Sequence, residues 1–256
     1  MASRHSNPVH STEFRFYEEL NDFLPAERRK RSFGYRFHGT PSVKDAIQAI
    51  GVPHAEVDLV LVDGESVGFE RLLRGGERVA VYPVFERLDI SPLLRLRPKP
   101  LRRTRFILDV HLGKLARHLR MLGFDATWSP DWDDVQIIDQ ALAERRIILT
   151  RDLGILKHNR VTHGYWLRAH QPALQVVEVL RAFELFSQTR PFTRCMDCNG
   201  RIAPVAKARI RAAINAAILR RFDNFWQCRD CGKVYWRGSH YLRMLEKIAA
   251  LGESAA

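Results

Sequence analysis

Two CxxC pairs constrain this chain more than any other feature of its sequence. Its only cysteines are Cys195, Cys198, Cys228 and Cys231. Four thiolates in two pairs supply the tetrahedral ligand set of a structural zinc ion and leave no coordination position open for a substrate. In a reducing compartment such pairs favour a metal over disulfides, and a redox-active thiol pair is the less favoured alternative. The sequence therefore predicts one structural Zn²⁺ site.

The 29 residues between the two pairs exceed the usual spacing, which predicts an insertion. The insertion contains AKARIRAAINAAILRRF, a basic stretch of good helix formers, and we expect a helix there. The same region mixes arginines with aromatic residues such as Trp226, Tyr235 and Trp236. These side chains suit the stacking of single-stranded bases, but packing of the rings against a neighbouring domain explains them equally well. We expect His240 to be a surface residue.

The net charge of the chain predicts a polyanionic partner. The charge is +12, and lysine and arginine contacts to phosphate dominate nucleic-acid affinity. A nucleic acid is the expected partner, and an anionic membrane surface is the weaker alternative. No apolar run approaches the roughly 18 residues of a membrane-spanning helix, and MASRHSNPVHSTE lacks the apolar stretch of a signal peptide. We therefore expect a cytoplasmic protein without a membrane partner.

Residues 13–90 read as a small α+β domain that follows a flexible tail at 1–12. Strand-like patterns occur at 14–20, 32–37, 58–64 and 77–85, and TPSVKDAIQAIG predicts a helix with a capping box at Ser42 and Asp45. This ββαββ order resembles the β-grasp (ubiquitin-like) folds of sulfur carriers. Those carriers act through a C-terminal Gly-Gly, whereas this chain continues through Glu86. We therefore expect a recognition or scaffolding domain, with a protein partner as a further expectation.

A second unit follows a basic, proline-rich linker at 91–104. The run RFILDV predicts a strand, and leucines from Leu112 to Leu122 predict a helix closed by Gly123. A further helix is expected from Asp134 to Arg145, with Val135, Ile138, Ala141 and Leu142 facing inward, followed by the strand RIILTRD. Strand, helix and strand with short connections indicate a parallel α/β sheet. We assign residues 105–187 to this domain and 188–250 to a zinc ribbon.

Carboxylates follow the two predicted strands of this sheet. Asp109 and Asp152 come directly after apolar strands, and Asp134 opens the intervening helix. Ligands bind beyond the carboxyl ends of parallel strands, and carboxylate oxygens suit Mg²⁺ or Mn²⁺. We expect Lys114, Arg117, Arg151 and Lys157 to bind the nucleic acid by gripping its phosphates. Each aspartate has an alternative role as a helix cap.

Three segments in this order, FILDVHLGKLARHLRMLGFD, DDVQIIDQALAERRIILTRD and the tail with RCMDCN and CGKVYWRGSHY, resemble the Mut-seven C-terminal RNase family. The resemblance covers roughly residues 105 to 245. It implies an α/β, PIN-like parallel-sheet nuclease domain with a fused zinc ribbon, and members of the family also carry an N-terminal β-grasp domain. It implies a metal-dependent ribonuclease whose catalytic metal ligands are Asp109, Asp134 and Asp152.

Two points of this resemblance stay open. Asp133 beside Asp134 leaves open which of them is the middle ligand, and a fourth acid, general in PIN-like domains, is not placed. The alternative function is a non-catalytic RNA-binding or scaffolding protein in which the acids only cap helices.

Overall fold

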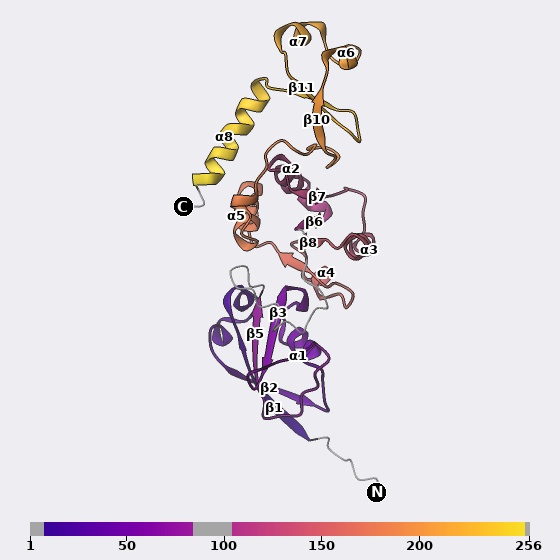
Figure 1. Cartoon of the computed structure of the whole chain (residues 1–256). Coiled ribbons are helices and arrows are strands. Elements are labelled where there is room, and N and C mark those ends of the chain that lie inside the picture. Colours follow the sequence, from indigo (N-terminus) through magenta and orange to yellow (C-terminus); the bar gives the residue numbers. More distant parts are fainter. Residues whose placement is uncertain (1–7, 84–103, 254–256) are drawn as a thin grey trace. The chain divides into compact units, whose positions relative to one another are not determined.

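The computed structural model describes residues 8–83 and 104–253, and the side chains only as far as Leu251. The chain forms two compact units (Figure 1). One comprises Met1–Arg102 and Asp152–Trp166, and the other comprises Arg103–Arg151 and Leu167–Ala256. The predicted linker at 91–104 lies outside the described residues, except for Thr104.

A five-stranded mixed sheet forms the centre of the first unit, in the order β2-β1-β5-β3-β4. The strands β1 and β5 pair in parallel, whereas β2 pairs antiparallel to β1, and β3 antiparallel to β5 and β4. The strands are β1 (Val9–Phe16), β2 (Phe33–His38), β3 (Val57–Val62), β4 (Glu65–Ser66) and β5 (Arg78–Pro83). This arrangement with one helix is a β-grasp fold, as predicted.

The helix α1 (Val43–Ile50) begins and ends as its sequence predicts. The Ser42 hydroxyl accepts from the backbone N–H of Asp45, and the Asp45 carboxylate accepts from the backbone N–H of Ser42. Gly51 ends the helix with φ +120°, a conformation that favours glycine. The buried face of α1 carries Val43 and Ile47 into a core that also contains Phe14 of β1 and Val81 of β5. The local signals and the packing therefore agree.

Two details of the first unit differ from the predictions. The strand β1 begins at Val9, so the expected tail at 1–12 is too long by four residues. His10, Ser11 and Thr12 pair with β2 although they lack an apolar pattern, because the ladder supplies their backbone hydrogen bonds. Residues 18–20, predicted as strand, instead lie in the 3-10 helix η1 (Glu18–Phe23), where Glu18 has φ +45°.

The first unit also contains the segment 152–166, which is distant in sequence from its sheet. This segment forms α4 (Leu153–Lys157) and β9 (Gly164–Trp166). Buried His54 in the 3-10 helix η3 (His54–Glu56) donates from Nε2 to the Val161 carbonyl at 2.8 Å, and its Nδ1 accepts from Gln48 at 3.1 Å. Gln48 also donates to the Lys157 carbonyl at 2.7 Å. Side chains of the β-grasp region thus bind backbone carbonyls of this segment.

The second unit contains a parallel sheet followed by a cysteine ribbon. The strand β6 (Arg105–Leu108) lies between β7 (Asp125–Thr127) and β8 (Ile147–Thr150), and both pair with it in parallel. The helix α3 (Asp134–Glu144) packs against β6 and β8, and α2 (Gly113–Met121) packs against β7 and α5 (Pro172–Ala182). The 3-10 helix η4 (Val110–Leu112) joins β6 to α2, and the remaining 3-10 helices are η2 (Ala26–Arg28) and η5 (Phe186–Gln188). The expected parallel α/β arrangement is confirmed.

The buried face of α3 differs from the prediction. Ile137, Ile138 and Ala141 are buried, whereas Val135 is 57% exposed and Leu142 is half-buried. Asp133 is the N-cap of α3 and forms a capping box with Gln136. Asp134 is therefore the first helical residue. Val135 therefore lies in the first turn, on the exposed side.

The ribbon has three antiparallel strands, β10 (Ile202–Val205), β11 (Phe225–Cys228) and β12 (Val234–Trp236). The single helix expected between the cysteine pairs is wrong: the insertion forms two short helices, α6 (Lys207–Ile210) and α7 (Ala216–Arg221). Asn215 fixes the start of α7, because its side chain accepts from the Ala217 N–H at 2.8 Å and caps that helix. The helix α8 (Ser239–Glu253) follows β12. None of the helices in residues 8–83 and 104–253 combines the length and the apolar character that crossing a membrane requires.

Candidate active site and metal centre

The four cysteines converge on one point of the ribbon. Their Sγ atoms all lie within 4.8 Å of one another. The separations of two cross-knuckle pairs are 3.7 Å for Cys195 with Cys231 and 3.4 Å for Cys198 with Cys228. Four sulfurs at about 2.3 Å from a tetrahedral zinc ion would lie roughly 3.8 Å apart. The donor set and its dimensions therefore fit Zn²⁺, as the spacing of the cysteines predicts.

The surroundings of Cys195 and Cys198 shift the pKa values of the two thiols in opposite directions. Burial would raise the pKa of Cys195, but hydrogen bonds from the backbone of Cys198 and from the Tyr235 hydroxyl, at 2.9 Å, lower this pKa to about 7. Burial and the adjacent thiols raise the pKa of Cys198 to about 12. A metal ion would take the place of the protons that the cluster otherwise holds.

The ribbon is anchored to the α/β sheet through α2. Arg120 is 2% exposed, and its Nη1 donates to the carbonyls of Asp197 at 2.6 Å and Met196 at 3.2 Å, both within the first cysteine knuckle. Its Nε donates to the Ala126 carbonyl of β7 at 2.6 Å. One buried guanidinium thus joins the helix, the sheet and the knuckle.

Asp125 of β7 forms a second anchor. It accepts from Arg146 at 2.7 Å, from Arg194 at 2.9 Å and from Asn199 at 2.8 Å. Burial would raise the pKa of Asp125, but the hydrogen bonds from Arg146 and Asn199 and the charges of the two arginines lower it below its ordinary value. Asp125 is therefore an ionised centre of the interface between the sheet and the ribbon.

Asp109 occupies the end of β6, as its position in the sequence predicts. It is 8% exposed, and its Oδ2 accepts from the Thr150 hydroxyl at 2.7 Å. It also precedes the 3-10 helix Val110–Leu112, but its side chain makes no capping hydrogen bond. A nearly buried carboxylate at the carboxyl end of the central strand, free of a capping role, is placed as a ligand-binding group would be.

The two acids before α3 have different positions. Asp133 caps the helix through Oδ1, which accepts from the Gln136 N–H at 2.8 Å. Asp134 is the first helical residue and is exposed. Asp133, and not the expected middle ligand Asp134, therefore caps α3.

Asp152 has the capping role that the sequence left open. Its Oδ1 accepts from the Gly154 N–H at 2.7 Å and caps α4, while the residue is exposed. Asp152 belongs to the first compact unit, and Asp109 and Asp134 belong to the second. Convergence of all three on one cation stays a prediction.

The four cations expected to grip phosphates have different surroundings. Lys114 and Arg117 lie in α2 and are exposed, and Arg117 pairs with Asp197 at 3.1 Å. Arg151 is exposed and contacts His170 at 3.0 Å, whereas Lys157 is half-buried in α4. An exposed pair such as Arg117 with Asp197 contributes little stability, so the arginine can exchange partners readily.

Sequence reasoning missed the residues that support these groups. Thr150 and Arg120 act through contacts between residues distant in the chain. The detectable signal was the position of Arg120, which follows Leu112 and Ala116 at helical spacing, because a charge on a buried helix face requires partners.

The described residues thus combine a β-grasp domain, a parallel α/β sheet and a ribbon with four clustered cysteines. The chain belongs to the Mut7-C RNase family: the model of the Mut7-C RNAse domain matches residues 104–248, and that of the Mut7-C ubiquitin domain matches residues 9–89. Membership of this family supports a nuclease-type function. A search of curated proteins gives no match.

Three solved structures are similar to part of the chain. The crystal structure of H. volcanii small archaeal modifier protein 1 has 18% identity, TM-score 0.24, and coverage of 30% of this chain and 99% of that one. The crystal structure of SAMP1 from Haloferax volcanii has 20% identity, TM-score 0.23, and coverage of 29% and 96%. The solution structure of the Haloferax volcanii HVO 2177 protein has 19% identity, TM-score 0.24, and coverage of 32% and 94%. At these TM-scores the similarity carries no argument about activity.

Proposed function

We propose that this protein is a ribonuclease that hydrolyses RNA phosphodiester bonds with Mg²⁺ or Mn²⁺ bound by Asp109, Asp134 and Asp152. The observation that carries the proposal is the carboxylate of Asp109 at the end of the central parallel strand, in a chain of the Mut7-C RNase family. A bound divalent cation would lower the pKa of a water molecule and neutralise charge on the phosphate.

The protein's own residues orient the ligands and the substrate in this proposal. Thr150 holds one oxygen of Asp109, which leaves the other oxygen for the cation. Lys114 and Arg117 on α2 and Arg151 after β8 supply exposed positive charge for RNA phosphates, together with Lys157. Their charge positions the backbone of the RNA and carries no sequence information.

The test is cleavage of a labelled single-stranded RNA by the zinc-loaded full chain. The reactions contain Mn²⁺, Mg²⁺ or no added divalent cation. A strong chelator is avoided because it would also remove zinc from the cysteines. We expect cleavage only with Mn²⁺ or Mg²⁺, and its loss in Asp109→Asn and Asp152→Asn. Asp131→Asn, an exposed acid before α3, is the matched control and should keep full activity.

The second candidate is a non-catalytic RNA-binding or scaffolding protein. The observation in its favour is that Asp152 caps α4 and Asp133 caps α3. It predicts RNA binding with no cation-dependent cleavage by the wild type, so the same experiment separates the two functions.

A further inference from the structure

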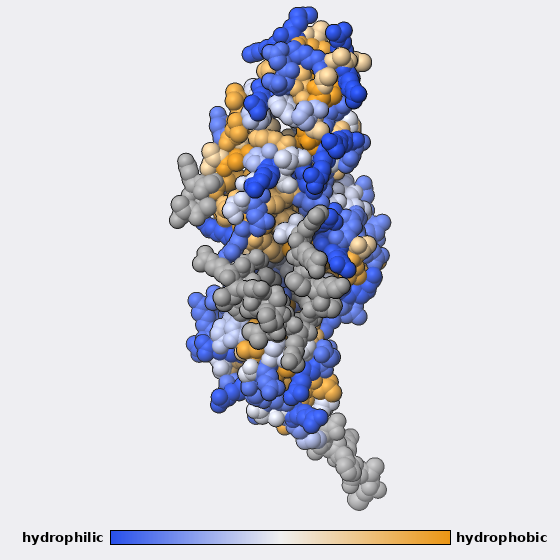
Figure 2. Space-filling view, viewed as in Figure 1, coloured by the Kyte–Doolittle hydropathy of each residue, from blue (hydrophilic) through white to orange (hydrophobic). Residues whose placement is uncertain are grey.

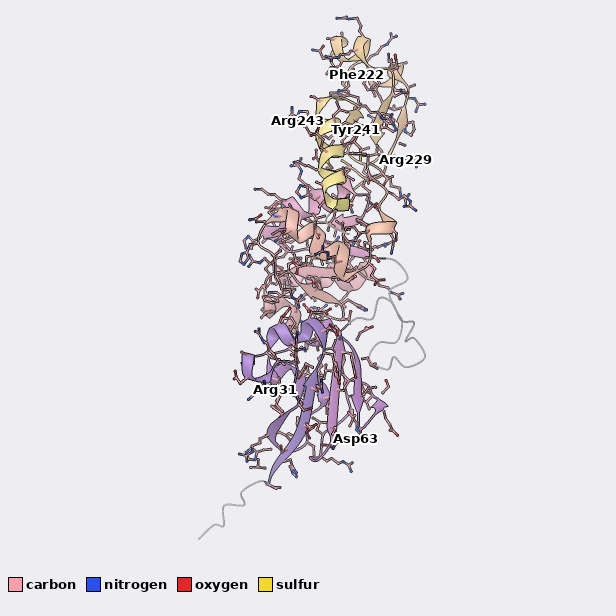
Figure 3. The ribbon with its side chains drawn as sticks, turned by 90° about the vertical axis from the view of Figure 1, so that its left-hand side faces the viewer. Arg31, Asp63, Phe222, Arg229, Tyr241 and Arg243 are labelled. Carbon is pink, nitrogen blue, oxygen red and sulfur yellow. The ribbon has the colours of Figure 1, made fainter. Side chains whose placement is uncertain are left out.

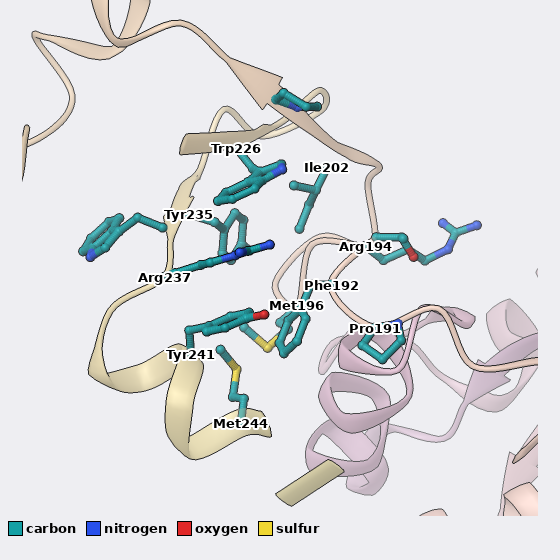
Figure 4. Close-up of a pocket in the computed structure, with 13 residues that line it drawn as sticks. Pro191, Phe192, Arg194, Met196, Ile202, Trp226, Tyr235, Arg237, Tyr241 and Met244 are labelled. Atoms are coloured by element: carbon teal, nitrogen blue, oxygen red, sulfur yellow. The ribbon is translucent and has the colours of Figure 1, made fainter. Parts of the chain in front are cut away.

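An aromatic pocket lies between the ribbon and the start of α8. Its volume is about 360 Å³, in the range of small-molecule sites. Five aromatic side chains line it: Phe192, Trp226, Tyr235, Trp236 and Tyr241. Figure 4 shows Phe192 approaching from the loop before the first knuckle, Trp226 and Tyr235 from β11 and β12, and Tyr241 from α8.

Arg237 gives this pocket its charge. Its guanidinium carbon lies 5.3 Å from the centre of the Trp226 ring and 5.6 Å from that of Tyr241. Figure 4 shows the side chain extending between these two rings. Arg237 is exposed, and within the described part of the chain its side chain has no recorded ion pair or hydrogen bond. It can therefore turn toward a ligand and lose only its contacts with these two half-buried aromatic residues.

The second cation at the pocket is already engaged. Arg194 donates to Asp125 at 2.9 Å and to the Asn199 carbonyl at 2.8 Å. The residues that line the pocket include no aspartate or glutamate. Aromatic cages that bind methylated amines attract a cation, whereas the charge of Arg237 in this pocket would repel one. Its chemistry fits a flat ring attached to an anion.

Single-stranded RNA has this chemistry. Its bases are free to stack on aromatic or guanidinium faces, and each carries a phosphate beside it. The bases of a duplex are stacked on each other and cannot enter such a pocket. Further positive charge lies on the insertion, where Arg209, Arg211, Arg220 and Arg221 are exposed. Electrostatic attraction therefore favours a nucleic-acid strand over an apolar ligand.

We propose that this pocket binds an unstacked base of single-stranded RNA, which stacks on Trp226 while Arg237 contacts the adjoining phosphate. The proposal rests on the proposed ribonuclease function and narrows its substrate class to strands with unpaired bases. The ribbon then serves as a substrate-binding element in addition to its zinc-dependent fold.

The test measures the affinity for RNA of the zinc-loaded full chain in the Asp109→Asn background. This background keeps the RNA intact under the nuclease proposal. The probes are a labelled RNA strand, the same strand annealed to its complement, and a strand of equal length without bases. Stacking of the base on Trp226 holds its phosphate at Arg237, so a duplex or a strand without bases does not make this contact. We expect Arg237→Ala to weaken binding of the single strand about tenfold, the scale of one hydrogen bond to a charged group, while binding of the other two probes changes little.

Arg243→Ala is the matched control, because Arg243 is an exposed residue of α8 outside the pocket (Figure 3). It removes the same charge and should weaken all three probes slightly and equally. Equal effects of Arg237→Ala and Arg243→Ala would overturn the proposal, as would equal affinity for strands with and without bases. Trp226→Leu should weaken binding of the single strand as Arg237→Ala does. If Trp226→Leu does not fold, the result for Arg237→Ala alone decides the test.

The outcomes separate this proposal from the nuclease proposal. If the wild type cleaves RNA but Arg237→Ala binds the single strand normally, only the pocket proposal fails. If the wild type never cleaves but Arg237→Ala loses single-strand affinity selectively, the pocket proposal holds and the nuclease proposal fails. A polyglutamate peptide that competes as well as RNA would show a general anion site and overturn the pocket proposal.

Discussion

The Thr150 hydroxyl donates a hydrogen bond of 2.7 Å to Oδ2 of Asp109 across two parallel strands. Both residues are buried, so the carboxylate depends on this donor in place of water. Thr150→Val keeps the shape of the side chain but removes the donor. We expect a loss of about 1–3 kcal/mol in the free energy of unfolding, measured in urea, because a buried acceptor loses a hydrogen bond.

Thr127→Val on β7 is the control for this change, since Thr127 is half-buried and no hydrogen bond of its side chain is recorded in the described residues. If both variants lose the same stability, the bond to Asp109 contributes nothing of its own. Under the nuclease proposal, cation-dependent cleavage by Thr150→Val should also fall.

Zinc removal should unfold the ribbon. Cys228→Ser takes away one of four ligands, and structural zinc contributes on the order of 10 kcal/mol to the folding of small sites. We expect zinc content to fall from one ion per chain to nearly none, measured by atomic emission after dialysis. Arg229→Ser, an exposed neighbour, should keep its zinc. Full zinc content in Cys228→Ser would contradict the four-thiolate site.

His54→Ala should loosen the segment 152–166. The change removes the donor to the Val161 carbonyl and the acceptor for Gln48. We expect faster amide hydrogen exchange in residues 155–161 and a loss of about 1–3 kcal/mol in the free energy of unfolding. His38→Ala, on the exposed side of β2, serves as the control. Unchanged exchange in His54→Ala would show that the segment is held by other contacts.

Gly123 permits the close approach between the end of α2 and the chain before the ribbon. Its φ is +95°, and a Cβ at this position would overlap the carbonyl oxygen of Arg190. Gly64 has φ +87° with no atom near its Cβ position, so Gly64→Ala measures the backbone strain alone. We expect Gly123→Ala to lower the melting temperature more than Gly64→Ala, because overlap adds to about 1 kcal/mol of strain. Equal shifts would contradict this account.

His118 should make stability depend on pH near neutrality. Burial, followed by the charges of Lys247 and Arg117, lowers the pKa of His118 below its ordinary value, and its buried Nδ1 has no hydrogen-bond partner in the described part of the chain. The folded state therefore favours the neutral ring. The stability due to the neutral ring is present above the unfolded-state pKa of about 6.5 and is lost as the pH falls below it.

The measurement for His118 is the free energy of unfolding in urea at about pH 7.5 and about pH 5.5, on either side of this pKa. The wild type should lose more stability than His118→Gln over this interval. His111→Gln, an exposed residue of η4, should behave as the wild type does. Parallel losses in the wild type and His118→Gln would exclude the proposed role of the ring.

The sequence predicted the ends of a helix where residues adjacent in the chain determine them. The capping box of Ser42 and Asp45 and the stop at Gly51 placed α1 correctly. The same reasoning failed for the insertion between the knuckles, where one helix ends at Ile210 and Asn215 caps a second one. Composition alone does not show such a break, because the flanking alanines favour a helix on both sides.

Contacts between distant residues could not be predicted from the sequence. The cysteine spacing fixes the zinc ligands, but the pocket around Arg237 combines residues from Pro191 to Met244 through packing alone. Hydrophobic residues also lie on the surface of α8, where Leu242 is 57% exposed (Figure 2). Catalysis by Asp109, Asp134 and Asp152 stays a prediction from their positions in the sequence and from the family.

The interleaving of the two units along the chain has a consequence for their synthesis. The first unit needs Asp152–Trp166 in addition to its N-terminal residues, and the second begins at Arg103. On a ribosome, the β-grasp sheet can therefore form before its partner segment exists, but the unit is complete only after Trp166 has emerged. Between those moments, His54 lacks the Val161 carbonyl that it binds in the finished protein. A fragment that ends at residue 102 lacks Asp152–Trp166 in the same way as this nascent chain.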